Sequence, residues 1–231
     1  MTAFYTGITS GTLYDVCESA LTQANLPLNR DGSVKWHLDE SLRNYTISFD
    51  RTGVNLTIAE VLQLCANAGK CVMAQDHSGK VRIEPQFLKL EDYTIDAFNS
   101  YSYPEFNLMK HLKAVNVNDG LYVHAVDTKG EIQTLNNSFI ADSSHAKDVA
   151  EWAAETLKYR RVVKGEIRID PRLEVADLVT VVSRYGELHA VGVTKLKTTF
   201  NGSFRGSYEG RVLEFKPVDS AYLGDVFSGE V

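Results

Sequence analysis

Residue types that could carry out chemistry are present in this sequence, but their spacing matches no familiar catalytic or metal-binding pattern. None of the motifs HExxH, GxSxG, Walker A or GxGxxG occurs in the 231 residues. Six histidines are scattered along the chain, and His111 and His124 flank a short turn across which they could face each other. An ordinary cross-strand pair explains these two residues more simply than a paired metal site does.

Two carboxylates are a second candidate for chemistry, because paired Asp and Glu side chains can cleave glycosidic bonds. Asp170 directly precedes Pro171, and Asp177 directly precedes the apolar run 178–182. Asp favours turns because its side chain bonds nearby backbone N–H groups, so we interpret both residues as turn residues. The sequence therefore predicts no catalytic residue, no cofactor and no metal, and leaves open a site that forms only in space.

The three cysteines, Cys17, Cys65 and Cys71, are too few for a disulfide framework. Cys17 and Cys65 fall on the apolar faces of expected helices, which predicts buried free thiols. Free thiols suit a protein that folds in a reducing cytosol.

The composition is that of an ordinary globular protein, with 44% hydrophobic and 23% charged residues. A formal net charge of −6 argues against a protein that binds nucleic acid through its charge. No stretch approaches the ~20 apolar residues of a membrane-spanning helix. The first residues lack the basic start and apolar run of a signal peptide.

The first part of the chain has the pattern of a small α+β domain. Apolar residues at helical spacing predict a helix over residues 12–25. Thr57 and Glu60 have the spacing of a capping box, which predicts the start of a second helix. A hairpin is expected over residues 71–84. We expect these elements to form one domain over residues 1–95.

The second part has the pattern of a mainly antiparallel β-sheet or barrel. Residues 96–110 are rich in Tyr and Asp and are expected to be a connector. An Asn-Asp-Gly turn predicts a hairpin over residues 111–126. Runs of β-branched residues between Gly, Pro, Asn and Asp predict at least three paired strands over residues 165–215. One long helix is expected over residues 146–160. The predicted fold is therefore α+β, with a β-rich second domain over residues 111–216 that carries this helix.

The stretch that follows the expected helix has a distinctive order of motifs. Tyr159-Arg160-Arg161 comes first, then a strand, Asp170-Pro171-Arg172-Leu173-Glu174-Val175-Ala176-Asp177, a Val-rich strand and a hairpin at Asn201-Gly202-Ser203. This order resembles the structural proteins of the bacteriophage tail baseplate hub or tail tip. The resemblance is weaker at the beginning of the chain. Members of that family often have Gly where Ala176 stands, so the turn before Asp177 departs from their pattern.

The resemblance implies a structural component of a bacteriophage tail, which closes the end of the tail tube and links host attachment to genome ejection. It implies no enzymatic activity. The implied partners are copies of the same chain, in a trimer or ring, and other tail proteins. The genome would pass nearby without specific nucleic-acid binding.

The implied location is the virion tail, after assembly in the cytoplasm of the host bacterium. Because hub proteins are usually longer, the chain is either a short version or a portion of a larger protein. Two alternative functions stay open. One is a tail-associated hydrolase of cell walls or polysaccharide, and the other is a module that binds a receptor or sugar.

Aromatic, basic and apolar residues are the candidates for an interface. Tyr and Phe are enriched at protein interfaces, although those of the connector could instead close a seam between domains. Two arginines follow the helix, where its C-terminus favours cations, and could also contact an acidic neighbour. Residues 217–231 are expected to be an extended tail that reaches a neighbouring subunit. The candidate interface residues are Tyr93, Tyr101, Tyr103, Phe106, Arg160, Arg161, Tyr222, Leu223 and Phe227.

Overall fold

The computed structural model describes residues 3–29, 31–49, 55–76, 78–86, 90–140, 142–168, 170–200, 202 and 204–216. The chain divides into two compact units, each built from two separate stretches of sequence. Unit 1 contains residues 1–85 and 110–158. Unit 2 contains residues 86–109 and the chain from residue 159 onward. The predicted tail over residues 217–231, with Tyr222, Leu223 and Phe227, lies outside the described residues.

Unit 1 begins with two helices whose first turns are fixed by capping boxes. At α1 (Leu13–Gln23), the Thr12 hydroxyl accepts from the Asp15 N–H at 3.1 Å, and the Asp15 carboxylate accepts from the Thr12 N–H at 3.0 Å. The same reciprocal arrangement starts α2 (Ile58–Ala68) at Thr57. Each box satisfies N–H groups that a first helical turn leaves without partners. Both predicted helices are confirmed.

Short strands accompany these helices. They are β1 (Ser10–Thr12), β2 (Trp36–Leu38), β3 (Thr46–Ser48), β4 (Val72–Gln75) and β5 (Val81–Glu84), with the 3-10 helix η1 (Glu40–Asn44) between β2 and β3. β1 pairs antiparallel with β3, while β5 pairs in parallel with β2 and antiparallel with β4. The hairpin expected over residues 71–84 is therefore confirmed.

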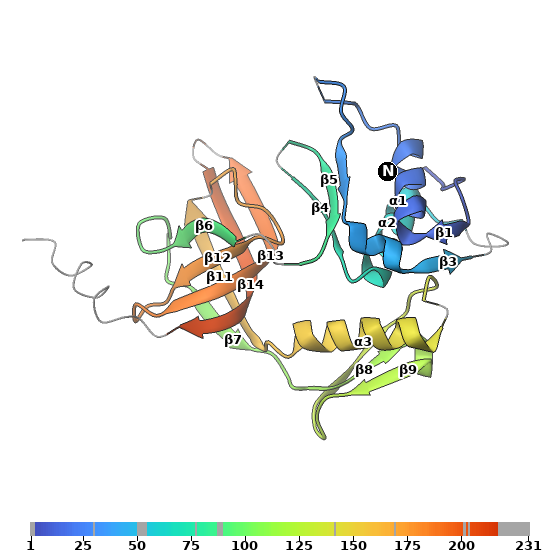
Figure 1. Ribbon diagram of the computed structural model, residues 1–231. Helices are drawn as coiled ribbons and strands as arrows, with labels where there is room; N and C mark the ends of the chain where they lie inside the picture. The colour runs from blue at the N-terminus through green and yellow to red at the C-terminus, as the bar shows by residue number, and fades with distance from the viewer. Residues whose placement is uncertain are drawn as a thin grey trace, which may run out of the picture. The chain divides into compact units, whose positions relative to one another are not determined.

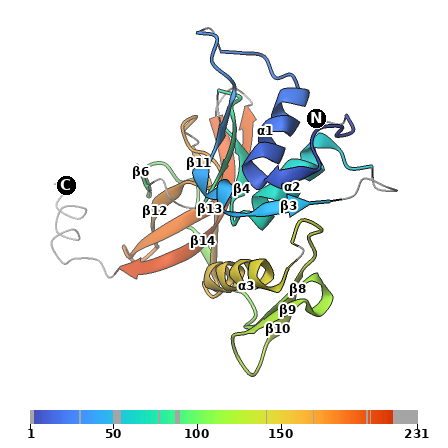
Figure 2. The ribbon, with the colours of Figure 1, turned by 45° about the vertical axis from the view of Figure 1, so that its right-hand side comes forward.

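The second stretch of unit 1 is a three-stranded sheet covered by a helix. Its elements are β8 (Leu112–Val117), the turn η2 (Asn118–Gly120), β9 (Tyr122–Ala125), β10 (Glu131–Leu135) and α3 (Ser143–Leu157). β8 lies in the middle, antiparallel to β9 and parallel to β10. The helix α3 packs along β8 and β9, as Figures 1 and 2 both show. The hairpin predicted over residues 111–126 is confirmed.

One apolar core joins the two stretches of unit 1. Phe139 and Ile140, which precede α3, are each 2% exposed, and they pack with the inner faces of α1 and α2. Val149 brings α3 into the same core. Cys17 and Cys65 are fully buried in it as free thiols, as their positions on apolar helix faces predicted.

Unit 2 is a six-stranded sheet in the order β6-β12-β13-β14-β11-β7, strongly twisted in Figure 1. Its strands are β6 (Leu90–Ile95), β7 (Glu105–Leu108), β11 (Arg161–Arg168), β12 (Leu178–Val182), β13 (Leu188–Phe200) and β14 (Phe204–Lys216). Neighbouring strands are antiparallel, except that β6 is parallel to β12. The paired strands predicted over residues 165–215 are confirmed. Among the described strands the sheet stays open, with β6 and β7 at its edges, so the barrel alternative is not found.

Alternate residues of these strands fill the core of unit 2. Val163 and Ile167 on β11 are fully buried. Lys164, which follows Val163, and Arg168, which follows Ile167, are exposed. This two-residue period is the expected one for a strand with one face on the core. The core residues are Ile95, Val163, Ile167, Leu173, Val179, Val181, Val191, Val193, Tyr208 and Val212.

The division of the chain differs from the expected domains 1–95, 96–110 and 111–216. Residues 110–158 belong to unit 1 and not to the β-rich unit. The helix expected over residues 146–160 is α3, which spans Ser143–Leu157 and covers the sheet that immediately precedes it in the chain. None of the described residues of unit 2 is helical, so its sheet does not carry the expected long helix.

The expected connector takes part in the sheet of unit 2. Its residues 105–108 form β7, which pairs with β11. Just before the connector, β6 pairs with β12 at the other edge. Both pairings join residues far apart in the sequence, and such pairings leave little trace in local periodicity.

The turn that leads into β12 holds Ala176 in a left-handed conformation with φ of 77°. Its N–H donates to the carbonyl of Val193 at 2.8 Å, and the carboxylate of Asp177 accepts from the Glu174 N–H at 2.7 Å. These bonds fix the turn against β13. A side chain with a Cβ is strained at this φ, whereas Gly is not.

We therefore expect Ala176→Gly to stabilise unit 2. Relief of the left-handed strain exceeds the added chain entropy, for a net gain of about 0.5–1 kcal/mol in the free energy of unfolding. Ala190→Gly, at a position of β13 without a positive φ, is the matched control and should lose a similar amount. Urea unfolding curves measure both changes, and a loss of stability in Ala176→Gly would contradict the strain argument.

A second prediction concerns Asn118, which ties the β8–β9 turn to the segment before α3. Its amide donates to the carbonyls of Asn137 at 2.9 Å and Ile140 at 2.7 Å and accepts from the Asn137 N–H at 2.7 Å. Its φ of 48° also suits Asn better than Ala. Asn118→Ala should cost about 2–4 kcal/mol. The exposed Asn136→Ala should change stability by less than about 0.5 kcal/mol in the same thermal or urea melts; equal effects would refute this role for Asn118.

Candidate interaction surface

Two of the aromatic interface candidates pack against the core of unit 2. Tyr93 is half-buried, and its hydroxyl donates to the carbonyl of Arg168 at 3.4 Å. Burial raises the pKa of the Tyr93 phenol. The ring of Phe106 also packs on this core, with its centroid 4.7 Å from that of the buried His189 imidazole. Both side chains therefore support the sheet from within.

Tyr101 and Tyr103 are instead exposed, at 44% and 62%. The guanidinium carbon of Arg205 lies 4.6 Å from the ring centroid of Tyr101, and that of Arg184 lies 5.8 Å from the ring centroid of Tyr103. Both distances fall within the range of cation–π attraction. We call these four residues the Tyr–Arg surface.

A small pocket with a volume of about 320 Å³ lies beside the two tyrosines. Loop 96–104 and the end of β12 line it, and Tyr101 and Tyr103 both belong to the lining. The two tyrosines therefore border the same pocket. Its lining residues are Asp96, Ala97, Ser100, Tyr101, Ser102, Tyr103, Pro104, Val182 and Ser183.

The loop beside the pocket is held by its own side chains. The Asp96 carboxylate accepts from the N–H groups of Phe98 at 2.9 Å and Asn99 at 3.3 Å. The Asn99 amide accepts from the Asp96 N–H at 2.9 Å and donates to the Thr94 carbonyl at 2.6 Å. This fixed turn presents Phe98 with 91% of its surface exposed.

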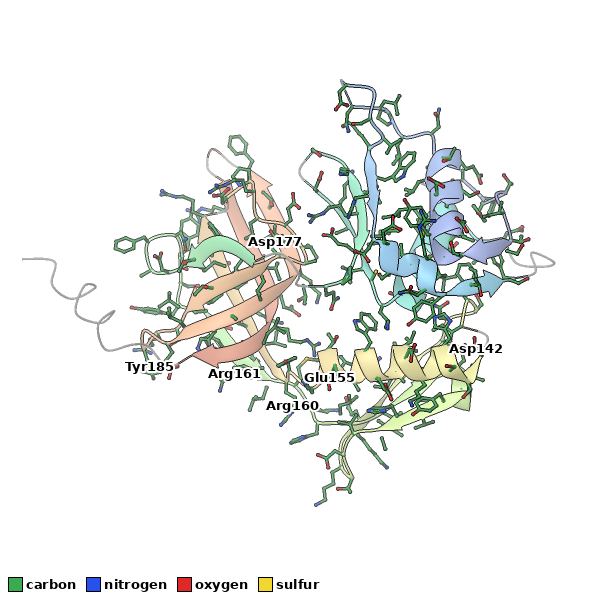
Figure 3. All side chains as sticks on the ribbon, in the orientation of Figure 1. Asp142, Glu155, Arg160, Arg161, Asp177 and Tyr185 are labelled. Atoms are coloured by element: carbon green, nitrogen blue, oxygen red, sulfur yellow. The ribbon has the colours of Figure 1, made fainter. Side chains whose placement is uncertain are left out.

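Arg160 and Arg161 lie at the start of β11, where Figure 3 labels them. Arg160 Nε donates to the Met109 carbonyl at 3.1 Å, so this side chain helps to close the β7–β11 edge. The Arg161 guanidinium lies 6.0 Å from the ring centroid of Phe106. The described structure brings neither arginine into the Tyr–Arg surface.

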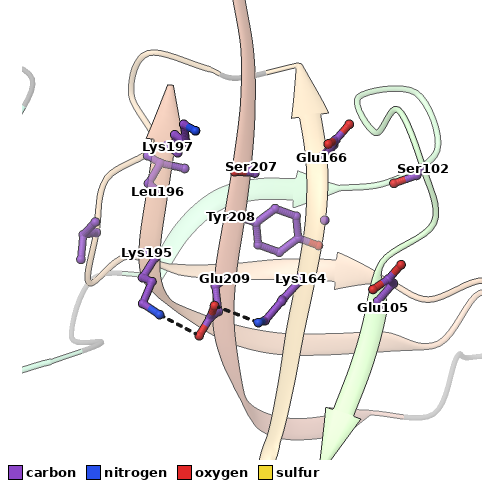
Figure 4. Close-up of a pocket in the computed structure, with 12 residues that line it drawn as sticks. Ser102, Glu105, Lys164, Glu166, Lys195, Leu196, Lys197, Ser207, Tyr208 and Glu209 are labelled. Carbon is purple, nitrogen blue, oxygen red and sulfur yellow. Dashed lines mark hydrogen bonds and ion pairs between the residues drawn. The ribbon is translucent and has the colours of Figure 1, made fainter. Parts of the chain in front are cut away.

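A row of alternating charges crosses four strands of unit 2. Lys195, Glu209, Lys164 and Glu105 are successive neighbours on β13, β14, β11 and β7. The two lysine Nζ atoms each lie 3.3 Å from a Glu209 carboxylate oxygen, as Figure 4 shows. Partial burial alone would raise the pKa of Glu209, but the two lysines hold this pKa below its usual value. The row lines an open groove of about 750 Å³.

Beneath this row, the ring of Tyr208 lies against Gly165 on the neighbouring strand (Figure 4). A Cβ on residue 165 would come within 2.7 Å of a carbon of the Tyr208 ring, so only glycine leaves room for the ring in this position. Tyr208 is 3% exposed, and its hydroxyl has no hydrogen-bond partner among the described residues. Burial raises the pKa of this phenol.

The carboxylates and histidines considered for catalysis have structural partners. Asp170 accepts from the N–H of Arg172 at 2.9 Å and from its guanidinium at 2.7 Å, and Asp177 closes the turn described above. His124 lies opposite Val115, not opposite His111. Within the described ranges, no group of three or more His, Cys, Asp or Glu residues could hold a metal ion. The helices of the described chain also include none with the length and apolarity needed to cross a membrane.

Tyr101 and Tyr103 were already candidates from the sequence, whereas Arg184, Arg205 and Phe98 were not. The arginines reach the tyrosines only through the sheet, since β12, β14 and loop 96–104 are far apart in the sequence. The Asp-Ala-Phe-Asn order at residues 96–99 is a turn pattern that could have predicted the exposed Phe98.

Solved structures with a similar fold are phage tail proteins and a related particle. The 43 kDa tail protein of prophage MuSo2 from Shewanella oneidensis matches with a TM-score of 0.59 and 10% identity, over 87% of this chain and 64% of that one. The tail protein from Neisseria meningitidis MC58 matches with a TM-score of 0.57 and 12% identity, over 90% and 68%. A chain of the virion of a native gene transfer agent particle matches with a TM-score of 0.53 and 13% identity, over 91% and 50%.

The resemblance to phage tail proteins is thus confirmed at the level of the fold. The chain spans 64% of the length of the Shewanella protein and half of the gene transfer agent chain. No model of a protein family matches the sequence, and a search of curated proteins finds no match.

The charged row gives a testable pH dependence. Because the folded pKa of Glu209 is lowered, its pairs stabilise the fold above the unfolded pKa near 4.5 and lose this effect as the pH falls through the folded value. At pH 7, Glu209→Gln should cost about 0.5 kcal/mol after solvent screening. The difference from the unmodified protein should disappear near pH 3.

Urea unfolding at the two pH values measures this difference. Glu166→Gln is the matched control, because Glu166 lies on the same groove without a lysine partner among the described residues. An equal cost for both substitutions, or a Glu209→Gln cost that persists at pH 3, would show that the two lysines do not stabilise the sheet through Glu209.

Proposed function

We propose that this chain is a structural component of a bacteriophage tail, of the baseplate hub or tail-tip type. The observation that carries the proposal is the shared fold with two prophage or bacterial tail proteins, over 87% and 90% of this chain. In this role the chain closes the end of the tail tube and links host attachment to genome ejection. It works in the virion after assembly in the host cytoplasm.

The proposed partners are copies of the same chain, as a trimer or ring, and other tail proteins. Both edges of the six-stranded sheet are open among the described strands. Open edges invite pairing with another chain, and proteins usually cover or pair them. Closed rings repeat one contact between two different surfaces of the same subunit. An open sheet of this kind therefore suits a ring-forming subunit.

The proposed role needs no catalysis and no cofactor from this chain. The carboxylates considered for hydrolysis are engaged in turns, and the three lysines and three glutamates that line the groove sum to zero charge. The genome passes through the tail without base-specific contacts. At the Tyr–Arg surface, each tyrosine already carries a guanidinium over its ring, which favours a protein contact over an open sugar platform.

Labelling of purified virions tests this function. A bacterium that produces the chain should release particles that contain it, detected by mass spectrometry. Antibody fragments against the exposed loop 96–104 should mark the end of the tail in electron micrographs. Deletion of the gene should yield particles with absent or incomplete tails, because a missing tube end prevents assembly.

An antibody against a capsid protein is the control for the micrographs. Complete, infectious virions that lack this chain would overturn the proposal. Cleared zones in a cell-wall zymogram would favour the hydrolase alternative instead. Specific binding on a glycan array, lost in Tyr101→Ala and Tyr103→Ala, would favour the sugar-binding alternative.

A further inference from the structure

Three cations gather on the outer face of the sheet of unit 2, at one end of its central strands. The strand registers place Arg168 on β11 directly opposite Arg205 on β14. Lys197 on β13 lies opposite Ser207, which follows Arg205 by two residues. Residues that are opposite each other, or two apart on one strand, point to the same face of a sheet. The three side chains are exposed on one face, and each backbone position lies about 5–8 Å from the next.

This arrangement of charges is unfavourable in the chain alone. Like charges directly opposite each other destabilise a sheet, and Arg168 and Arg205 are such a pair. Among the residues that the structure describes, neither arginine makes an ion pair, and Lys197 makes none either. One carboxylate, Glu166, lies opposite Ser207 on the same face (Figure 4) and is also without an ion pair in these ranges. Three cations beside one carboxylate leave two positive charges without compensation.

A pocket of about 580 Å³ lies against this cluster. Arg205 and Lys197 both line it. Thr199 and Ser207 also line it, and their hydroxyl groups can donate hydrogen bonds to a ligand. The ring of Tyr101 forms another part of the lining and holds the Arg205 guanidinium, so less side-chain entropy is lost when this arginine binds. The volume is that of a site for a small molecule.

The excess charge and the donors of the pocket indicate the chemistry of its ligand. A phosphomonoester carries a charge of about −1.5 to −2 at pH 7 and has three acceptor oxygens, which matches two uncompensated cations with several donors. Guanidinium groups bind phosphate through two parallel hydrogen bonds. A carboxylate or the phosphodiester of a nucleic acid carries a single charge and would balance only half of the excess.

We propose that Arg168, Arg205 and Lys197 form a binding site for the phosphate group of a small phosphomonoester. Thr199 and Ser207 complete the site with their hydroxyl groups. The pocket has room for a phosphate group together with the small molecule that carries it. This site goes beyond the proposed tail function and does not depend on it.

Isothermal titration calorimetry on the full chain tests the site. The two probes are glycerol 3-phosphate and inorganic phosphate, at pH 7 and at an ionic strength held constant with sodium chloride. We expect glycerol 3-phosphate to bind, and Arg168→Gln and Arg205→Gln each to weaken its binding by about tenfold or more. Glu166→Gln should instead tighten binding by about two- to fivefold, because it removes a carboxylate that repels the phosphate. The matched control is Lys113→Gln, an equal loss of charge at an exposed position of unit 1, which should bind like the unmodified chain.

The like-charge pair gives a second readout. Without phosphate, Arg168→Gln should raise the melting temperature by about 1–3 °C, because it removes the repulsion and leaves Arg205 over the Tyr101 ring. Glycerol 3-phosphate should raise the melting temperature of the unmodified chain and of Lys113→Gln, and should have little effect on Arg168→Gln. Circular dichroism monitors the melts and shows that each variant is folded.

The other outcomes overturn the site. A folded, unmodified chain that binds neither probe has no phosphate site, and equal weakening in Lys113→Gln would indicate only a general attraction of charge. Weaker binding in Glu166→Gln would contradict the charge argument. Binding of inorganic phosphate without glycerol 3-phosphate would assign the pocket to the free ion and exclude the ester. An oligothymidylate strand that binds more tightly than glycerol 3-phosphate, and is lost in the same arginine variants, would make the surface a nucleic-acid contact.

Discussion

The rest of the structure depends on how the chain is held where residues 110–158 leave unit 2 and rejoin it. The Met109 N–H donates to the Arg160 carbonyl at 2.8 Å, and Arg160 Nε donates to the Met109 carbonyl at 3.1 Å. The pairing continues from Leu108 and Arg161 into β7 and β11. This excursion is therefore closed at its base, and the entropy cost of closing a loop rises only slowly with its length. Unit 1 takes Phe139 and α3 from this excursion, and unit 2 takes β7 from the residues directly before it.

Elements fixed by neighbouring residues could be predicted from the sequence. The capping box at Thr57, the left-handed turn at Asn118 and the alternation in β11 each depend on residues within a few positions of one another. Pairings between distant strands could not be predicted in the same way. β6 reads Leu-Glu-Asp-Tyr-Thr-Ile, without a clean two-residue alternation, and its partner β12 follows it by more than eighty residues. The placement of α3 failed for a related reason, since an apolar helix face does not specify which sheet it will cover.

The candidate surface was predicted only in part for the same physical reason. An exposed tyrosine and a half-buried one look alike in a sequence, so Tyr93 and Tyr101 were grouped although one supports the core and the other faces solvent. Arg205 lies more than a hundred residues after Tyr101 and reaches it only because β14 and β11 pair beside loop 96–104. The turn at Asp177, by contrast, could be predicted from the sequence, because its carboxylate has a partner only three residues away.

The charges of unit 2 fall into two groups with different consequences. In the groove, Glu209 lies between Lys164 and Lys195, and the three lysines and three glutamates that line it sum to zero charge, so the field available to a partner is small. Arg184 and Arg205 each lie over a tyrosine ring, and Arg205 also lines a pocket that includes Glu166 and Lys197. Coulomb attraction at a protein surface acts through charges that are not already neutralised at short range. The two arginines of the Tyr–Arg surface are thus held over tyrosine rings, whereas the lysines of the groove are held by ion pairs with Glu209 that join neighbouring strands of the sheet.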